Sequence, residues 1–296
     1  MKFYKYQGAG NDFLIADNRD GSITEKEGVL YSHVGGAEWS MPISDICDRR
    51  YGVGADGLML LDPGAGEDDF QMTYFNSDGS GGMMCGNGGR CMVAFAKDCG
   101  VEGADLPDGT KKYVFTAADG PHEAYVMNED GHGKTIRLKM KDVYEYQKYE
   151  NLTGVDVPSD GYFLDTGTRH YVRFVENLDE YNIVTEGREI RYKASELQPV
   201  GANVNYAEPV NGVLKVRTYE KGVEDETFAC GTGIVASAIA SYINGTAPAA
   251  VDQDSRVRYD IQAKRDQLAV DFIPNCTLAK DVFLTGPAVF VCEIEI

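Results

Sequence analysis

The sequence predicts an α/β protein of the α+β type with two similar halves, and three observations support this prediction. Most segments are short runs rich in Val, Tyr, Phe and Ile that end in Gly, Asp or Asn turns, as β-strands do. Two longer segments have the composition of helices, and each begins with a Cys-Gly-polar-Gly motif. The length of 296 residues exceeds the usual size of one hydrophobic core, so two domains are expected.

The expected strands follow one another along the whole chain. Their apolar residues often alternate with polar ones, which indicates sheets with one buried face. They are Lys2–Tyr6, Phe13–Asp17, Gly57–Asp62, Gln71–Phe75, Lys111–Ala117, Glu123–Met127, Thr135–Met140, Tyr162–Asp165, His170–Val175, Val213–Tyr219, Gln267–Phe272 and Val289–Glu295.

Helical signals are fewer. A short helix is expected before Arg50, and two clear helices run from Gly88 to Asp98 and from Gly233 to Ile243. Gly100 and Gly245 follow these two helices at the position where a glycine caps a helix C-terminus.

The two clear helices belong to an internal repeat. CGNGGRCMVAFAKDCG starts at Cys85, and CGTGIVASAIASYING starts 145 residues later at Cys230. Each copy follows a strand and a turn, so a repeated α/β unit explains both. We expect residues 1–120, with about 280–296 returning to them, to form the domain that carries Cys85. We expect residues 121–279 to form the domain that carries Cys230.

Composition narrows the possible functions. The formal net charge of −19 argues against nucleic acid, which requires a basic surface, but leaves room for a locally positive pocket. The chain contains no run of about 18 apolar residues, so no membrane span is expected. The first residues, MKFYKYQGAGNDFLI, do not resemble a signal peptide, and we expect a cytoplasmic protein.

The motifs do not support two common kinds of site. GVGADG at residues 52–57 matches the dinucleotide fingerprint, but a strand follows it where that fingerprint needs a helix. Cys85, Cys91 and Cys99 do not have the spacing of zinc ligands, and the sequence has no C-x-x-C pair. We therefore expect no metal site. Five cysteines are expected to be buried packing residues: Cys47, Cys91, Cys99, Cys276 and Cys292.

Cys85 and Cys230 have different surroundings from these five. A thiol just before a helix lies at the positive end of the helix dipole, which stabilises the thiolate. The glycines that follow allow backbone amides to approach an anion such as a carboxylate. Two equivalent thiols suit the inversion of a stereocentre, in which one group removes a proton and another returns a proton on the opposite face. Helix N-termini aimed at the carboxylate of an amino acid would stabilise the intermediate, so no cofactor is expected.

Several motifs resemble those of the diaminopimelate epimerase family. They are YKYQGAGNDF (4–13), RYGVGADGLMLL (50–61), FNSDGSGGMMCGNGGRC (75–91), GANVN (201–205) and RTYEKGVEDETFACGTG (217–233). The resemblance implies two pseudo-symmetric domains, each a mostly antiparallel sheet wrapped around a central helix, with the active site in the cleft between them. It also implies a homodimer that converts LL- to meso-diaminopimelate, without a cofactor, for lysine and peptidoglycan precursors.

The resemblance assigns roles to residues within these motifs. Cys85 and Cys230 correspond to the acid/base thiols. The amides that hold the reacting carboxylate correspond to those of Gly86, Asn87, Gly231 and Thr232. Further substrate contacts correspond to Asn11, Asn76, Asn203 and Glu220. The groups that tune the pKa of the cysteines correspond to His170 and Glu220.

The chain also departs from the family pattern. GTRH, Gly167–His170, stands where Gly-Asn/Ser-Pro-His is common, so Thr168 replaces a usual substrate ligand. Lys221 stands where an arginine clamps the distal carboxylate; it keeps the charge but loses the planar fork. Arg169 either takes over this clamp or faces solvent, and the second is favoured. Gly57 stands where some relatives have glutamine.

These departures leave other functions open. A racemase or isomerase acting on another amino acid would use the same thiols with a different distal pocket. A non-catalytic, redox-sensing protein would instead use Cys85 and Cys230 as a pair that oxidises to a disulfide.

Overall fold

The computed structural model describes residues 1–33, 38–82, 84–131, 133–275 and 278–296. Its contacts divide the chain into two compact units. Unit 1 comprises Met1–Leu138 and Gly286–Ile296, and unit 2 comprises Lys139–Thr285. Within the described ranges, no helix is both long and apolar enough to cross a membrane.

A hairpin explains why the boundary differs from the expected one at residue 120. β10 (Gly120–Asp130) pairs antiparallel with β9 (Lys111–Ala117), and β11 (Gly133–Lys139) pairs with β10. ADGPH at residues 118–122 is therefore a turn inside unit 1 and not a linker. The chain returns to unit 1 at Gly286, about six residues beyond the expected position.

Eight strands of unit 1 pair in a closed ring. In order they are β1 (Lys2–Gly8), β2 (Asn11–Asp17), β6 (Gly57–Pro63), β7 (Phe70–Asn76), β9, β10, β11 and β21 (Leu278–Glu295), which pairs with β1 again. The pairs β2–β6 and β7–β9 are parallel, whereas β1–β2, β6–β7 and β9–β10 are antiparallel. A closed ring has little open edge. The short β8 (Ala104–Asp105) pairs with the start of β9 and extends the sheet there.

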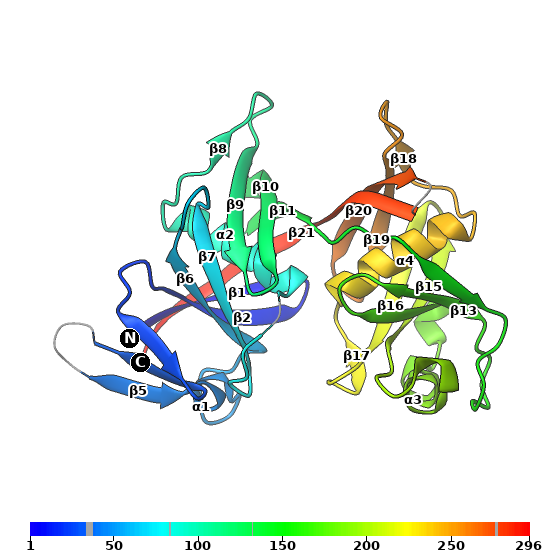
Figure 1. Ribbon diagram of the computed structural model, residues 1–296, viewed down its shortest axis with the longest axis horizontal. Helices are drawn as coiled ribbons and strands as arrows, with labels where there is room; N and C mark the ends of the chain where they lie inside the picture. The colour runs from blue at the N-terminus through cyan, green and yellow to red at the C-terminus, as the bar shows by residue number, and fades with distance from the viewer. Residues whose placement is uncertain (34–37, 83, 132, 276–277) are drawn as a thin grey trace. The chain divides into compact units, whose positions relative to one another are not determined.

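Helix α2 (Gly86–Asp98) lies among these strands (Figure 1). Every residue from Gly86 to Ala96 is buried, as expected for a helix enclosed on all sides. The helix ends as the sequence predicts: Gly100 has φ +75°, and its amide donates to the Lys97 carbonyl at 3.0 Å.

A small second layer covers one part of the unit 1 ring. It consists of the sheet β3 (Ile23–Lys26), β4 (Val29–Ser32) and β5 (Trp39–Pro42), followed by the short helix α1 (Ile43–Cys47). Leu30, Ile43 and Ile46 are fully buried and pack with Phe3, Leu14 and Leu58 of the ring. This layer was not predicted, apart from α1.

Unit 2 has a similar ring around α4 (Gly231–Ile243). Its strands are β12 (Tyr146–Tyr149), β13 (Gly161–Asp165), β14 (Arg169–Phe174), β15 (Asn203–Val210), β16 (Val213–Glu220), β19 (Val257–Gln262), β20 (Gln267–Asn275) and the first part of β21. A bridge between Val143 and Ala279 joins β21 to the segment before β12. The short β17 (Asp225–Thr227) and β18 (Ala250–Val251) extend the sheet, and α3 (Ile183–Lys193) packs outside it on β15 and β16.

The two units share one topology. β13, β14, β15, β16 and β19 pair in the same order and sense as β1, β2, β6, β7 and β9. At the start of the parallel pair β14–β15, His170 pairs with Asn203; at the start of β2–β6, Phe13 pairs with Gly57. The predicted repeat is therefore a repeat of structure, and the predicted fold of two similar sheets around two helices is confirmed.

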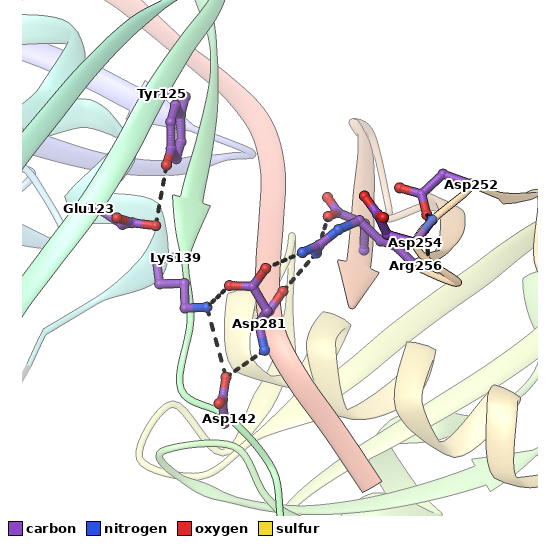
Figure 2. Close-up of polar contacts among 9 residues, drawn as sticks. Glu123, Tyr125, Lys139, Asp142, Asp252, Asp254, Arg256 and Asp281 are labelled. Atoms are coloured by element: carbon purple, nitrogen blue, oxygen red, sulfur yellow. Dashed lines mark hydrogen bonds and ion pairs between the residues drawn. The ribbon is translucent and has the colours of Figure 1, made fainter. Parts of the chain in front are cut away.

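β21 serves both rings, and a group of ion pairs fixes its first part within unit 2 (Figure 2). Asp281 accepts from Lys139 and Arg256, and its amide donates to Asp142 at 2.8 Å. Arg256 also pairs with the buried Asp271 at 2.7 Å. These contacts lie near the two places where the chain enters and leaves unit 2.

Candidate active site

Each unit places one thiol directly before its enclosed helix. Cys85 and Cys230 both have extended backbones, with φ −107° and −104°, and their carbonyls accept the first helical bonds from Gly89 and Ile234. Within the described part of the chain, neither helix start has a side-chain cap hydrogen bond from its N-cap cysteine. The first-turn amides, which have no acceptor within a helix, therefore point toward the thiol and can receive an anion.

In unit 1 the Cys85 thiol lies beside Asn11. Its Sγ is 3.8 Å from Asn11 Oδ1, and Asn87 Nδ2 lies 3.5 Å from the same oxygen. Asn11 Nδ2 donates to Asp56 at 2.6 Å, which orients the amide so that its oxygen faces the helix start. The structure thus brings together Cys85, Gly86, Asn87 and Asn11 as the sequence predicts.

Arg90 is a site residue that the sequence did not reveal. It lies one turn into α2, is fully buried, and donates to the Gly86 carbonyl at 3.2 Å and to Asn87 Oδ1 at 3.0 Å. Its charge adds to the positive potential at the helix start and lowers the pKa of Cys91, although burial outweighs this effect. The sequence feature that could have indicated a buried arginine is its position among glycines and apolar residues, in GGRCMV.

The remaining predicted residue of unit 1, Asn76, ends β7 opposite Gly57. Asn76 is exposed, and its amide donates to Ser80 Oγ at 2.9 Å in the turn that follows. At Gly57 a Cβ would lie 2.7 Å from the Phe75 carbonyl and 2.9 Å from the Tyr74 ring. A residue larger than glycine at this position would therefore have to displace both the Tyr74 ring and the Phe75 backbone.

In unit 2 the Cys230 thiol belongs to a polar group of four residues. Its Sγ lies 3.5 Å from Thr232 Oγ1, which is 2.9 Å from His170 Nε2. Thr168 Oγ1 is 2.9 Å from the same nitrogen and 3.1 Å from Thr232 Oγ1. The sequence predicted each of these residues, but not that the hydroxyl of Thr232, rather than its amide alone, would face the sulfur.

His170 is fully buried and electrically neutral. Burial lowers its pKa to about 3, although its contact with Asn205 acts in the opposite direction. Asn205 Nδ2 is 3.1 Å from His170 Nδ1, so the ring is held on both of its nitrogens. A neutral ring influences Cys230 through hydrogen bonds and not as a cation.

Other predicted residues of unit 2 surround this group. Glu220, at the end of β16, accepts from Thr227 at 2.7 Å. Asn203 accepts from the Lys221 amide at 2.8 Å and donates to the Arg169 carbonyl at 3.2 Å, so its side chain ties β14 to the end of β16. The Lys221 side chain is exposed.

Arg169 does not face solvent as favoured from the sequence. Its guanidinium donates to the Leu197 carbonyl at 3.0 Å and lies over the Phe163 ring, 5.0 Å from the centroid. Alternation along β14 explains this: His170 points into the ring of strands, so Arg169 points to the opposite face of the sheet.

The two half-sites have equivalent geometry but different chemistry. The third helical residue is glycine in both, Gly88 and Gly233. A Cβ at Gly88 would meet Met59 Sδ at 3.2 Å and Phe13 at 3.6 Å. A Cβ at Gly233 would meet Asn205 Oδ1 at 2.3 Å and His170 at 3.2 Å. By strand register, Phe13 and Met59 occupy the places of His170 and Asn205, so an apolar pair in unit 1 corresponds to a polar pair in unit 2.

The other cysteines follow the prediction in part. Cys47 and Cys91 are buried, and burial raises the pKa of both to about 12. Cys99 and Cys292 are half-buried, so the prediction of full burial is wrong for them. Cys99 caps the end of α2 and Cys292 lies on β21 where it pairs with β1, both at the margin of the core. Cys276 lies outside the described residues.

Sequence comparisons agree with these motifs. A family model described as diaminopimelate epimerase matches residues 3–141 and 162–268. The diaminopimelate epimerase of Flavobacterium psychrophilum is 38% identical over 297 residues, with 100% of both chains covered. That of Aquifex aeolicus is 39% identical over 298 residues, with 99% of this chain and 96% of the relative covered.

Solved structures with the same fold are more distant in sequence. A Bacillus anthracis phenazine biosynthesis protein of the PhzF family has a TM-score of 0.69 at 14% identity, covering 100% of this chain and 98% of its own. A probable proline racemase from Agrobacterium radiobacter K84 has a TM-score of 0.67 at 13% identity, covering 100% and 92%. At these identities the likeness establishes the fold.

Proposed function

Because this chain belongs to the diaminopimelate epimerase family and is an isomerase, we propose that it interconverts LL- and meso-diaminopimelate with the thiols of Cys85 and Cys230. The observation that carries the mechanism is the equivalent placement of these two thiols, each immediately before an enclosed helix with a glycine-rich first turn. Such a placement stabilises a thiolate and offers amides to a carboxylate at the same point.

The reaction balances without a redox step or a cofactor. One cysteine thiolate takes the α-proton and becomes a thiol, and the electron pair of the broken C–H bond moves into the α-carboxylate. The amides of Gly86, Asn87, Gly231 and Thr232 stabilise the added negative charge. The second cysteine gives a proton to the opposite face of the α-carbon and becomes a thiolate. The reverse reaction exchanges the two roles.

The remaining polar residues suit a substrate that carries both charges. Glu220 provides a carboxylate for an ammonium group, and Asn11, Asn76 and Asn203 provide amides. Lys221 provides the cation for the distal carboxylate, with a single ammonium in place of an arginine fork. Asn11 and Asn203 are already oriented by Asp56 and by the Lys221 amide, which reduces the cost of ordering them around a ligand.

The setting of this activity follows from its product. We assign the chain to the cytoplasm, where it supplies precursors for lysine and peptidoglycan, as a homodimer that binds this small molecule and no nucleic acid. The strongly acidic composition supports the last point.

Deuterium exchange tests the reaction. In D2O, LL-diaminopimelate should gain deuterium at the α-carbon as it is converted to the meso form. Cys85→Ser and Cys230→Ser should each lose inversion by at least about a hundredfold, because one face loses its proton carrier. Cys91→Ser is the matched control: Cys91 lies on the same helix but is buried, and it should leave turnover largely intact. Equal loss in Cys91→Ser would contradict the assignment of Cys85.

A second candidate is a racemase or epimerase of another amino acid. Thr168 and Lys221 favour it, because they change two positions that the resemblance assigns to substrate binding. A panel of amino acids in the same D2O experiment separates the two. Exchange in a monocarboxylic amino acid but not in diaminopimelate would support this candidate, and no exchange in any substrate under reducing conditions would refute both.

A further inference from the structure

Unit 2 contains a chain of hydrogen bonds that leads from the interior of its ring to the reacting thiol. We propose that this series of hydrogen bonds, from Asn205 through His170 to Thr232 and called the relay below, makes the Thr232 hydroxyl a hydrogen-bond donor to the Cys230 thiolate. Thr232 is then a catalytic residue, because it touches the reacting sulfur, and His170 and Asn205 are positioning residues. The inference rests on the proposed function in one respect: that Cys230 is a proton carrier.

The chain begins at Asn205, whose amide can adopt only one orientation. Its Nδ2 lies 3.3 Å from the backbone carbonyl of Tyr171, which accepts hydrogen bonds and cannot donate them. Its Oδ1 accepts from Thr218 Oγ1 at 2.9 Å. Turning the amide over would place two oxygens against each other at the Tyr171 carbonyl. Asn205 therefore presents an N–H to its third neighbour, His170.

This N–H determines the tautomer of His170. Asn205 Nδ2 donates to Nδ1 across 3.1 Å, so Nδ1 carries no proton. Because the ring is buried and neutral, its single proton lies on Nε2. Nε2 is then a donor to the hydroxyls around it, and it cannot accept a proton from either Thr232 or Thr168.

The tautomer in turn directs the hydroxyl of Thr232. Thr232 Oγ1 lies 2.9 Å from His170 Nε2, as Thr168 Oγ1 does, and accepts from its N–H, which leaves the Thr232 proton free to point at the Cys230 sulfur 3.5 Å away. Thr168, at 3.1 Å, can add a second hydrogen bond to the same oxygen. With the opposite tautomer, Nε2 would accept the Thr232 proton and draw it away from the sulfur.

The equivalent place in unit 1 lacks this device. There Phe13 and Met59 stand where His170 and Asn205 stand in unit 2, and neither side chain has an N–H or O–H group that could donate a hydrogen bond. The Cys85 sulfur instead lies near the oxygen of Asn11, which accepts. The relay is therefore specific to Cys230, and Cys85 serves as an internal reference in the same molecule.

Charged groups also lie at the strand ends near the start of α4. Strands β13, β14, β15, β16 and β20 pack against α4; β13 and β16 end, and β14 and β15 begin, at the strand ends that carry the predicted site residues. Their titratable groups there are Asp165, which accepts from the Gly167 amide; Arg169, which donates to Leu197; and Glu220, which accepts from Thr227. His170 is the titratable side chain joined to the Cys230 sulfur through Thr232.

Two substitutions of Thr232 isolate the hydroxyl. The pH dependence of iodoacetamide alkylation is measured separately for Cys230 and Cys85 by peptide mass spectrometry, on reduced enzyme without substrate. Thr232→Val should raise the midpoint for Cys230 by about one pH unit, a tenfold smaller thiolate fraction below the midpoint. Thr232→Ser should restore it, and Cys85 should not move. Equal midpoints in the valine and serine variants would overturn the proposal.

The tautomer is tested directly by 15N NMR of the histidine rings, with the His170 signals identified from their loss in His170→Gln. The native ring should show an unprotonated Nδ1 and a protonated Nε2; the reverse would overturn the proposal. Asn205→Asp replaces the donor by an acceptor, so it should reverse the tautomer and raise the Cys230 midpoint as Thr232→Val does. If this variant fails to fold, the native spectrum and the Thr232 pair still decide.

Neither measurement uses turnover, so failure here is distinct from failure of the proposed function. Unchanged midpoints with normal deuterium exchange would refute the relay alone. Shifted midpoints without exchange on any substrate would retain the relay and refute the epimerase.

Discussion

Replacing each of the two equivalent helix glycines by alanine is the most direct test of how the half-sites differ. Gly88 and Gly233 are both the third residue of their helices, and neither has a positive φ, so alanine suits both backbones. In a helix, alanine is favoured over glycine by up to about 1 kcal/mol. The expected difference therefore comes from what the new methyl group meets.

The methyl at residue 88 meets a flexible neighbour. Its closest contact is Met59 Sδ at 3.2 Å, and an unbranched thioether can move by a few tenths of an ångström. We expect the free energy of unfolding to change by less than about 1 kcal/mol, because the small crowding offsets the helix gain.

The methyl group at residue 233 meets a rigidly held neighbour. Asn205 Oδ1 would lie 2.3 Å away, and this buried amide is held by Thr218, the Tyr171 carbonyl and His170. Overpacking costs about 1–3 kcal/mol and a disrupted buried amide about 1–3 kcal/mol more. After the helix gain, we expect a net loss of about 1–5 kcal/mol, together with at least a tenfold fall in activity because the relay to Cys230 is disturbed.

The assay is urea unfolding followed by circular dichroism, with hydrogen exchange of the α2 and α4 amides to assign any loss to one unit. Gly233→Ala should weaken protection in α4 and leave α2 unchanged. If the two variants differ in stability by less than about 0.5 kcal/mol, the polar group at the start of α4 is not rigid and the reasoning is refuted.

Three further predictions concern charge. Lys221→Arg should leave the KM for diaminopimelate unchanged or lower it, since arginine adds a second parallel hydrogen bond to a carboxylate; a several-fold rise in steady-state KM would mean that the pocket is built around lysine. Burial lowers the pKa of His170 from 6.5 to about 3, so between these pH values the unfolded chain binds a proton that the native state does not bind. The free energy of unfolding should therefore fall as the pH drops from 6.5 toward 3. The urea unfolding midpoint of His170→Gln should depend less on pH over this range. Arg256→Gln should cost about 2 kcal/mol at pH 7 by removing one ion-pair partner of the buried Asp271. Burial opposes ionisation of Asp281, but Lys139 and Arg256 hold its pKa below 3.8. Part of that cost should therefore disappear as the pH falls through this lowered value, and a series of urea unfolding curves from pH 7 downward measures it.

Much of the fold was readable from the sequence because its strands and two main helices have strong local signals. The missed elements depend on contacts that are distant in sequence. Helix α3 contains Gly187, a poor helix former, but a Cβ there would lie 2.6 Å from Tyr219 Cβ, so the glycine is required for α3 to pack on β16. Strand β15 begins with five buried residues, but Glu208 and Pro209 near its end weaken the strand signal in the sequence.

The site divides in the same way. The thiols could be predicted because the motif occurs twice, at Cys85 and Cys230. The link between His170 and Asn205 could not, because it arises from the parallel pairing of β14 with β15, across 35 residues that include α3. Arg90 was missed because a basic residue in a helix is usually solvated, whereas the closed ring of unit 1 buries it completely.

The shared strand β21 also bears on the order in which the protein is made. Unit 1 begins with the first residue but closes its ring only with residues after 285, whereas unit 2 is complete by that point. As the chain leaves the ribosome, the half that carries Cys85 must wait with β1 paired on one side to β2 and open on the side that later takes β21, while the half that carries Cys230 can already fold. The first half to be synthesised is thus the last to be finished, and its exposed strand edge in the nascent chain is a point at which a chaperone would act.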